Sequence, residues 1–355
     1  MSARPPCPDR RDWMARCARG GAVLAVGALG TGPGAMGARA QTRPPSARPW
    51  RIVAVTYRGR TEVEDGFEAH FRERGLPIEF IHRDIALDAT RLPALVPEIR
   101  ALRPDLVTTW GTPVTLGLVG PWNGADPQRH LTELPVVFSL VAAPVSSGLV
   151  PSMASSGRNL TGVSHVPPLA SQMQVMADYR PFRRVGVLHS PNEANTQAVL
   201  QALRERGRAR GFEVMDRPFA TNPAGQPVAE GARERVAALR AAGAEWLYLP
   251  PDSFLGTQLR SAVLPEALAQ RLPTFASTEQ QIAAGALTGL VSRYASVGRF
   301  AAYKAEQILR EGRAPASLPV ETLSRFALQV RLPLARALGL PPPLAWFNRA
   351  ELLDG

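Results

Sequence analysis

From residue 50 onward, short apolar runs alternate with segments of helical periodicity. The segment 62–75 places its apolar residues on one helix face and ends at a glycine, and 91–102 and 114–119 are also predicted as helical. The apolar runs are too short for buried helices and predict buried strands at 51–57, 78–83, 105–110 and 134–141. A parallel sheet with helices on both faces produces this alternation, so the pattern predicts an α/β fold.

The same order of elements returns after about residue 164. A predicted strand at 183–190 leads into a helix at 193–211 that ends in glycine, as 51–57 leads into 62–75. Further elements follow, with strands at 212–217, 244–250, 272–277 and 286–292 and helices at 230–243 and 253–270. The repeat predicts two lobes of one architecture, although few residues are identical.

The tail beyond residue 293 is expected to connect these lobes. It contains a predicted helix at 297–311, a strand at 318–323 and a strand–helix piece at 327–338. We therefore predict an α/β fold with two doubly wound parallel-sheet lobes joined by a multi-strand hinge. The first lobe is expected to comprise 50–163 with 293–325, and the second 164–292 with 326–355.

The first 40 residues have the pattern of an export signal. Arg10 and Arg11 give a basic start, an uncharged run of apolar and small residues follows, and the segment ends in ARA at 38–40. The run is too short and too rich in glycine for a good membrane span. We expect cleavage after Ala40, a flexible leader at 41–49, and export to the periplasm by the twin-arginine or the general secretory route.

Charge and cysteine content narrow the class of function. The formal net charge is +11, but the arginines are scattered through helix-like segments and not clustered with aromatic residues, which disfavours nucleic-acid binding. Cys7 and Cys17 are the only cysteines, so neither disulfides nor thiol chemistry is expected after the export signal.

The sequence carries no recognisable catalytic or metal-binding motif. It lacks a G-x-S-x-G nucleophile elbow and an H-E-x-x-H pair. Of the five histidines, only His189 is expected at a strand end in a ligand cleft, as a wall or hydrogen-bonding residue. No catalytic residue, metal or cofactor is predicted, although Glu193 and Asp252 could serve a hydrolase as acid and base.

Five polar turns follow predicted strands, two in the first half and three in the second. They cover 108–115, 139–144, 189–196, 250–254 and 276–281. In open parallel sheets, ligands bind beyond the carboxyl ends of the strands, where helix N-termini favour anions. The hydroxyl, amide and carboxylate groups of these turns suit a zwitterion. For Thr112, Asp252, Ser253 and Thr278, each taken singly, helix capping remains the alternative.

Several segments of the chain resemble one protein family. The segments SPNEANT (190–196), YLPPDSF (248–254), LPTFAST (272–278) and LGLPPPLAWFNRAELL (338–353) are similar to segments of ABC-transporter substrate-binding proteins, whose better-known members bind tryptophan and other aromatic amino acids. The resemblance covers about 50–350 and preserves the order of the motifs. It implies the type I periplasmic-binding-protein fold, in which two α/β lobes trap a ligand, and the stretch 135–164 resembles the family's join between the lobes.

Candidate ligand contacts are carried over from this resemblance by position. The turns at 111–112, 193–196, 252–253 and 277–278 match those that receive the ligand in the family, and further candidates lie at neighbouring strand ends. The complete set is Tyr57, Arg58, Gly111, Thr112, Ser139, Ser190, Glu193, Asn195, Thr196, Asp252, Ser253, Ser277, Thr278 and Tyr294.

Departures from the family pattern affect the expected ligand. Ala143 stands where the family usually has an acidic residue, and 292–294 differs where the family often has an aspartate. Arg58, Arg60 and Arg293 are therefore candidates for binding a second acid group, because arginine matches a carboxylate with two parallel bonds. The ligand is left open between an amino acid and an aromatic or dicarboxylic acid.

Taken together, these features predict a periplasmic receptor that captures a small carboxylate-bearing ligand, an amino acid or a related organic acid. The expected partner is an ABC permease in the inner membrane, and the protein is expected to be a monomer that binds no nucleic acid. A receptor of the same fold that serves a sensor kinase or chemoreceptor is the main alternative, and a secreted hydrolase is the second.

Overall fold

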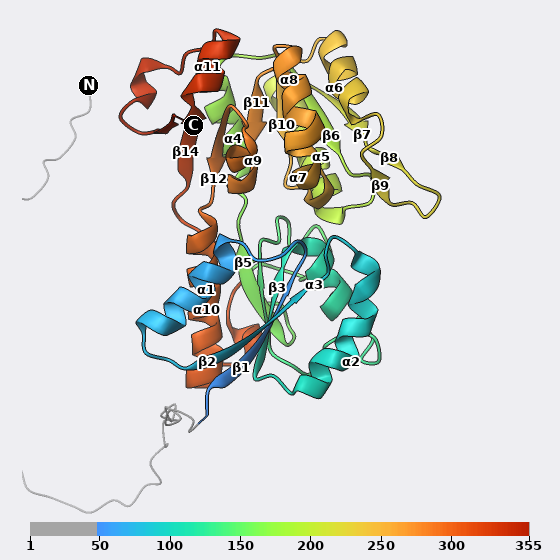
Figure 1. Cartoon of the computed structure of the whole chain (residues 1–355), viewed down its shortest axis with the longest axis vertical. Coiled ribbons are helices and arrows are strands. Elements are labelled where there is room, and N and C mark those ends of the chain that lie inside the picture. The colour runs from blue at the N-terminus through green and yellow to red at the C-terminus, as the bar shows by residue number, and fades with distance from the viewer. Residues whose placement is uncertain (1–47, 355) are drawn as a thin grey trace, which may run out of the picture. The chain divides into compact units, whose positions relative to one another are not determined.

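Apart from one two-stranded hairpin, the strands form two separate, mainly parallel sheets (Figure 1). A computed structural model describes residues 48–354, so the predicted export signal and most of the predicted leader lie outside the described residues. The first sheet has the order β13 (Glu321–Thr322), β5 (Leu160–Ser164), β4 (Val136–Ser139), β3 (Leu106–Trp110), β1 (Trp50–Thr56), β2 (Ile78–Asp84). The second has the order β15 (Glu351–Leu353), β14 (Ala327–Arg331), β12 (Thr288–Val291), β11 (Thr274–Ala276), β10 (Trp246–Leu249), β6 (Arg184–His189), β7 (Glu213–Pro218).

Helices cover both faces of each sheet. On the first sheet, α1 (Glu62–Glu73) and α10 (Tyr294–Glu311) pack on one face, and α2 (Leu92–Leu102) and α3 (Gly111–Val119) on the other. On the second sheet, α4 (Leu169–Tyr179), α5 (Ala194–Arg210) and α11 (Leu332–Leu338) oppose α6 (Ala232–Ala241), α7 (Ser253–Gln258), α8 (Leu264–Ala269) and α9 (Glu279–Ala284). We call each sheet with its helices a lobe.

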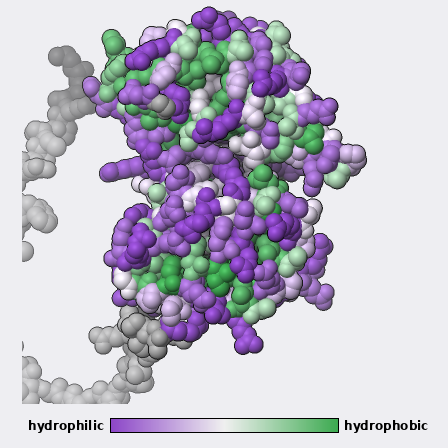
Figure 2. Space-filling view, viewed as in Figure 1, coloured by the Kyte–Doolittle hydropathy of each residue, from purple (hydrophilic) through white to green (hydrophobic). Residues whose placement is uncertain are grey.

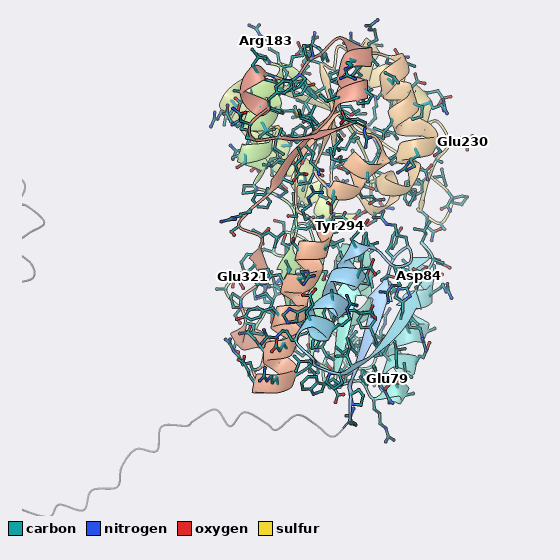
Figure 3. The ribbon with its side chains drawn as sticks, turned by 60° about the vertical axis from the view of Figure 1, so that its left-hand side comes forward. Glu79, Asp84, Arg183, Glu230, Tyr294 and Glu321 are labelled. Atoms are coloured by element: carbon teal, nitrogen blue, oxygen red, sulfur yellow. The ribbon has the colours of Figure 1, made fainter. Side chains whose placement is uncertain are left out.

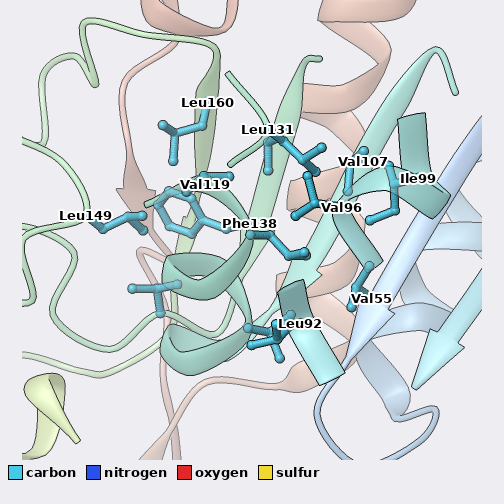
Figure 4. Packing of buried hydrophobic residues seen from close by; sticks show 14 of the residues in the cluster. Val55, Leu92, Val96, Ile99, Val107, Val119, Leu131, Phe138, Leu149 and Leu160 are labelled. Atoms are coloured by element: carbon cyan, nitrogen blue, oxygen red, sulfur yellow. The ribbon is translucent and has the colours of Figure 1, made fainter. Parts of the chain in front are cut away.

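The strands carry apolar side chains on both faces of each sheet, which explains why helices pack on both faces. In β1, Ile52 packs toward α1 and α10, whereas Val53 and Val55 pack toward α2 and α3. Successive side chains of a strand point to opposite faces, so a continuous apolar run requires helices on both sides. Figure 4 shows part of the core on the α2 and α3 side, where Val96 and Phe138 are fully or nearly fully buried.

Helix α10 reaches the first lobe from the tail and packs closely against α1. A Cβ atom added to Gly298 would lie 1.9 Å from the carbonyl oxygen of Val63, and one added to Gly66 would lie 2.2 Å from that of Ala295. Only glycine permits this approach of two helix backbones. A capping box between Thr61 and the residue three positions into α1 fixes where that helix begins.

The two sheets repeat the same strand order, as the sequence predicts. From β2 to β5 and from β7 to β12, the two sheets place corresponding strands in the same order. The chain passes between the lobes after β5, after β12 and after β13, all at the same side of the two sheets. The predicted fold class, two doubly wound lobes with a multi-strand hinge, is confirmed, while the residue limits assigned to each lobe stay a prediction.

One predicted helix is interrupted. The segment 253–270 contains a π-helical turn, Leu259–Val263, between α7 and α8. Pro265 has no N–H for the carbonyl of Ser261, and this carbonyl instead accepts a hydrogen bond from Arg233 Nη2 at 2.7 Å.

Some short elements were not expected from the sequence. They are β5, α4, α9, β15, the hairpin of β8 (Ala220–Thr221) and β9 (Pro227–Val228), and 3-10 turns at Ala89–Arg91, Pro315–Ser317 and Leu344–Trp346. Strand β5 gives a weak signal because its central Gly162 lies against Phe138, where a Cβ atom would approach within 2.4 Å.

Candidate functional site

Loops from both lobes line one cavity beyond the carboxyl ends of the strands. The loops after β1, β3, β4 and β5 contribute from the first lobe, and those after β6, β10 and β11 from the second. The cavity has a volume of about 390 Å³, including space that is open to solvent. Figure 3 shows Tyr294, the first residue of α10, at the level between the lobes, and the surface at this level is largely hydrophilic (Figure 2).

Nine of the candidate residues line this cavity, namely Arg58, Gly111, Thr112, Glu193, Asn195, Asp252, Ser253, Thr278 and Tyr294. The structure therefore brings together residues from strand ends that are up to about 240 positions apart in the chain. Whether each of them contacts a ligand stays a prediction.

The other five candidates do not line the cavity. The hydroxyl of Ser190 donates to Asp252, and that of Ser277 donates to the carbonyl of Leu249. Tyr57 stacks on an indole ring, and Thr196 and Ser139 are buried. These side chains support the cavity from behind or face the lobe interior.

Two acidic residues of the second lobe lie side by side in the cavity. Glu193 precedes α5, and its carboxylate accepts from Ser253 N at 2.8 Å and from Ser253 Oγ at 2.9 Å. Asp252 precedes α7, and its carboxylate accepts from Ser190 N at 2.6 Å, Ser190 Oγ at 2.8 Å and Leu255 N at 2.8 Å. Each acid is thus held by the neighbouring strand-end turn, which fixes both side chains relative to one another.

Burial perturbs the protonation of this acid pair. The carboxyl group of Glu193 is withdrawn from water and lies near Asp252, and these two causes raise the pKa of Glu193 to about 8. Burial also raises the pKa of Asp252, although its hydrogen bonds oppose the shift. The pair consequently retains a proton at neutral pH in the absence of a ligand cation.

A cation of the first lobe lines the same cavity as this pair. Among the described residues that line the cavity, Arg58 is the one permanent cation, and no carboxylate of residues 48–354 forms an ion pair with it. Its guanidinium carbon lies 4.7 Å from the ring centroid of Trp110, which stacks on Tyr57 at 6.5 Å with an interplanar angle of 9°. Burial lowers the pKa of Arg58.

Three buried polar atoms of the cavity wall have no hydrogen-bond partner within residues 48–354. They are Thr112 Oγ1, His165 Nδ1 and Asn195 Oδ1. Buried polar atoms in native proteins nearly always have a partner, and an unpaired one costs about 1–3 kcal/mol. Their concentration around one cavity indicates a site for a polar ligand.

Of the four candidate residues that could have been only helix caps, two do cap a helix. Asp252 caps α7 through Leu255 N, and Thr278 forms a capping box with Gln281 at the start of α9. Thr112 caps nothing, because Trp110 is the cap of α3. Asp252 and Thr278 also line the cavity, so capping and a role in the site coexist.

Two sequence-based hypotheses about charge are not supported. Arg60 Nη2 donates to Asp65 at 2.9 Å and to Glu68 at 2.7 Å, and Arg293 pairs with Glu279 and Glu351. Both arginines are engaged by carboxylates of the protein, which leaves Arg58 as the candidate for an acid group of the ligand.

The prediction for His189 holds for its position at the end of β6 but not for its place in the cavity. This residue does not line the cavity, and its Nε2 lies 3.1 Å from Asp216 Oδ2. The histidine in the cavity wall is His165, which follows β5.

Sequence reasoning missed several wall residues. Trp110, Leu140, Pro251 and Gln281 lie within the predicted polar turns, so their turns were found but their side chains were not selected. His165 lies outside all five turns and has no local signal.

The family of the chain follows from its sequence. The model for the family described as ABC transporter substrate binding protein matches residues 52–343. The chain belongs to this family. A curated relative, the tyrosine-binding protein of Clostridioides difficile (strain R20291), is 23% identical over 209 residues, which are 59% of this chain and 58% of that protein. The match therefore spans less than two thirds of the relative.

Solved structures of other bacterial proteins share the fold. An ABC domain from Streptococcus pneumonia in complex with L-Trp superposes with a TM-score of 0.73 at 19% identity, covering 85% of this chain and 99% of that one. A conserved domain protein from Vibrio cholerae gives a TM-score of 0.75 at 19% identity, covering 86% and 100%. These likenesses confirm the type I periplasmic-binding-protein fold.

The family and the curated relative are binding proteins, as expected for a receptor. None of the helices in the described part of the chain combines the length and apolar character of a membrane span.

Proposed function

We propose that this chain is the receptor of an ABC importer and that its ligand is an aromatic α-amino acid. The observation that carries the proposal is the placement of Glu193 and Asp252 in the same cavity as Arg58. An α-amino acid offers an ammonium group to the acids and a carboxylate to the guanidinium. Each of these desolvated groups would then gain a charged partner, whereas an uncharged ligand would leave them without one.

The remaining wall of the cavity supports an aromatic side chain on the ligand. Trp110, Leu140, Pro251 and Tyr294 provide apolar and aromatic surface beside the charged groups. Binding pockets of this kind combine an apolar lining with a few polar groups that orient the ligand. The relatives that are named for tyrosine or were solved with L-Trp support the same ligand class.

The proposal includes export to the periplasm, a monomeric receptor and delivery of the ligand to a permease in the inner membrane. The family supports this setting. The lobes are proposed to close on the ligand. Small-angle scattering should then give a smaller radius of gyration with ligand than without it, and an unchanged radius at saturation would contradict closure.

A thermal-shift screen followed by calorimetry tests the ligand class. Tyrosine, tryptophan or phenylalanine at 100 times its dissociation constant should stabilise the protein by about 2.7 kcal/mol. Tyramine lacks the carboxylate and 3-(4-hydroxyphenyl)propionate lacks the amine, so each should bind at least tenfold more weakly than tyrosine. Stabilisation confined to sugars, metals or nucleotides would refute the proposal.

Matched substitutions test the charged groups. Arg58→Gln should weaken amino-acid binding roughly tenfold to a hundredfold, the usual effect of losing a charge-assisted hydrogen bond. Arg60→Gln is its control, because that arginine is already paired with Asp65 and Glu68. Equal affinity of the two variants would show that Arg58 does not hold the carboxylate.

A further inference from the structure

His165 is a buried histidine without a hydrogen-bond partner among residues 48–354. It is 4% exposed, lines the cavity and lies where the chain leaves β5 for the second lobe. Its Nδ1 is enclosed and unpaired. Burying an imidazole that makes no hydrogen bond to the protein costs free energy. Its presence in the wall of a binding cavity therefore suggests that a ligand supplies the hydrogen-bond partner.

The other four histidines show that this state is unusual in the chain. Each of them has a hydrogen-bond partner: Glu306 for His70, Thr56 for His82, Asp126 for His130 and Asp216 for His189.

The imidazole of His165 is electrically neutral. Burial lowers its pKa to about 3, so one ring nitrogen carries hydrogen and the other accepts a hydrogen bond throughout the physiological range. The ring packs edge-to-face on Tyr294, with centroids 6.2 Å apart and an interplanar angle of 81°. This contact restrains the plane of the imidazole and therefore the direction from which a ligand group can approach.

The strand that precedes His165 is not a neighbour of the strands that precede the charged groups, although the Arg58 side chain extends from β1 over Trp110 at the end of β3. In the first sheet, β4 and β3 lie between β5, which precedes His165, and β1, which precedes Arg58. In the second sheet, Glu193 and Asp252 follow β6 and β10, away from the hinge side that His165 occupies. An amino acid held at its α-carbon by the charged groups would place its side chain among Trp110, Leu140 and His165, which line the same cavity.

We infer that His165 is a specificity-determining residue, which accepts a hydrogen bond from an O–H or N–H group on the aromatic side chain of the ligand. The inference rests on the proposed function and deepens it. The site selects tyrosine or tryptophan over phenylalanine, because phenylalanine would leave the buried imidazole unpaired.

Calorimetry on the native chain tests this selectivity directly. Dissociation constants are measured for L-tyrosine, L-tryptophan, L-phenylalanine and L-4-fluorophenylalanine, the last of which places fluorine where tyrosine has its hydroxyl. We expect phenylalanine and its fluorinated analogue to bind at least tenfold more weakly than the better of the other two. If all four bind equally, the inference is overturned while the proposed function stands; if none binds, both fail.

Two substitutions then assign the selectivity to His165. His165→Phe keeps a planar ring but cannot accept the bond, and should reduce the preference for tyrosine or tryptophan over phenylalanine to less than threefold. His165→Gln supplies a neutral donor and acceptor and should retain part of the preference. Binding of phenylalanine reports that each variant is folded. An undiminished preference in His165→Phe would overturn the inference.

Discussion

Replacing Glu193 by glutamine should remove the pH dependence of amino-acid binding. In the native protein, burial and the neighbouring Asp252 raise the pKa of Glu193 to about 8, so the free site is mostly protonated at neutral pH. The ammonium group of a ligand favours the ionised carboxylate, and binding must therefore release a proton. The charges of a free amino acid itself do not change between pH 6 and 8, so the dependence belongs to the protein.

The size of the effect follows from the pKa. Because the pKa of Glu193 is raised to about 8, its ionised fraction rises steeply between pH 6 and 8, and affinity should increase by at least about tenfold over this interval. Glu193→Gln should show no such increase. At pH 8 it should bind roughly tenfold to a hundredfold more weakly than the native protein, because one charge-assisted hydrogen bond is lost.

Calorimetry with L-tyrosine at pH 6, 7 and 8, in two buffers with different ionisation enthalpies, measures both the affinity and the number of protons released. The exposed Glu230 provides the control, since Glu230→Gln should retain the native dependence. A native dissociation constant that does not change between pH 6 and 8 would show that the acid pair is not the ammonium site.

Three further results are expected. Between pH 5 and 8, the free energy of unfolding of the ligand-free native protein should fall by on the order of 3 kcal/mol relative to that of Glu193→Gln. The reason is that the folded native state keeps a proton on Glu193 that the unfolded state releases. Urea titrations in which both proteins show the same dependence on pH would contradict this. Gly256→Val should weaken ligand binding at least tenfold with little loss of thermal stability, because an added Cβ atom would lie 3.0 Å from Arg58 Nη1 of the other lobe. Unchanged affinity would mean that binding does not need the close approach of Arg58 to Gly256. Gly298→Val should lower the free energy of unfolding by about 3 kcal/mol or more, because the Cβ atom of the valine would overlap the carbonyl of Val63. A native-like urea midpoint for this variant would exclude close packing of α1 and α10.

The fold class, and the strand ends from which nine of the candidate residues reach one cavity, could be predicted from local sequence patterns. Apolar runs such as 51–57 and 105–110, separated by helical periodicity, are satisfied only by strands buried on both faces. Polar turns at the ends of such strands must lie at the same edge of a parallel sheet, which is why Glu193 and Asp252 were predicted near one another. These are local patterns, and they require no knowledge of distant contacts.

Which side chains of these turns face the cavity depends on contacts between segments that are distant in the chain. Ser190, Ser253 and Ser277 all follow buried strands, and all three hydroxyls donate to protein acceptors, yet only Ser253 lines the cavity. The approach of Arg58 to Gly256 joins residues about 200 positions apart and leaves no trace in either local sequence. His165 is the clearest example of a residue that local sequence could not identify. Distant segments pack around its ring without offering a hydrogen-bond partner among residues 48–354, and the sequence near His165 does not reveal this.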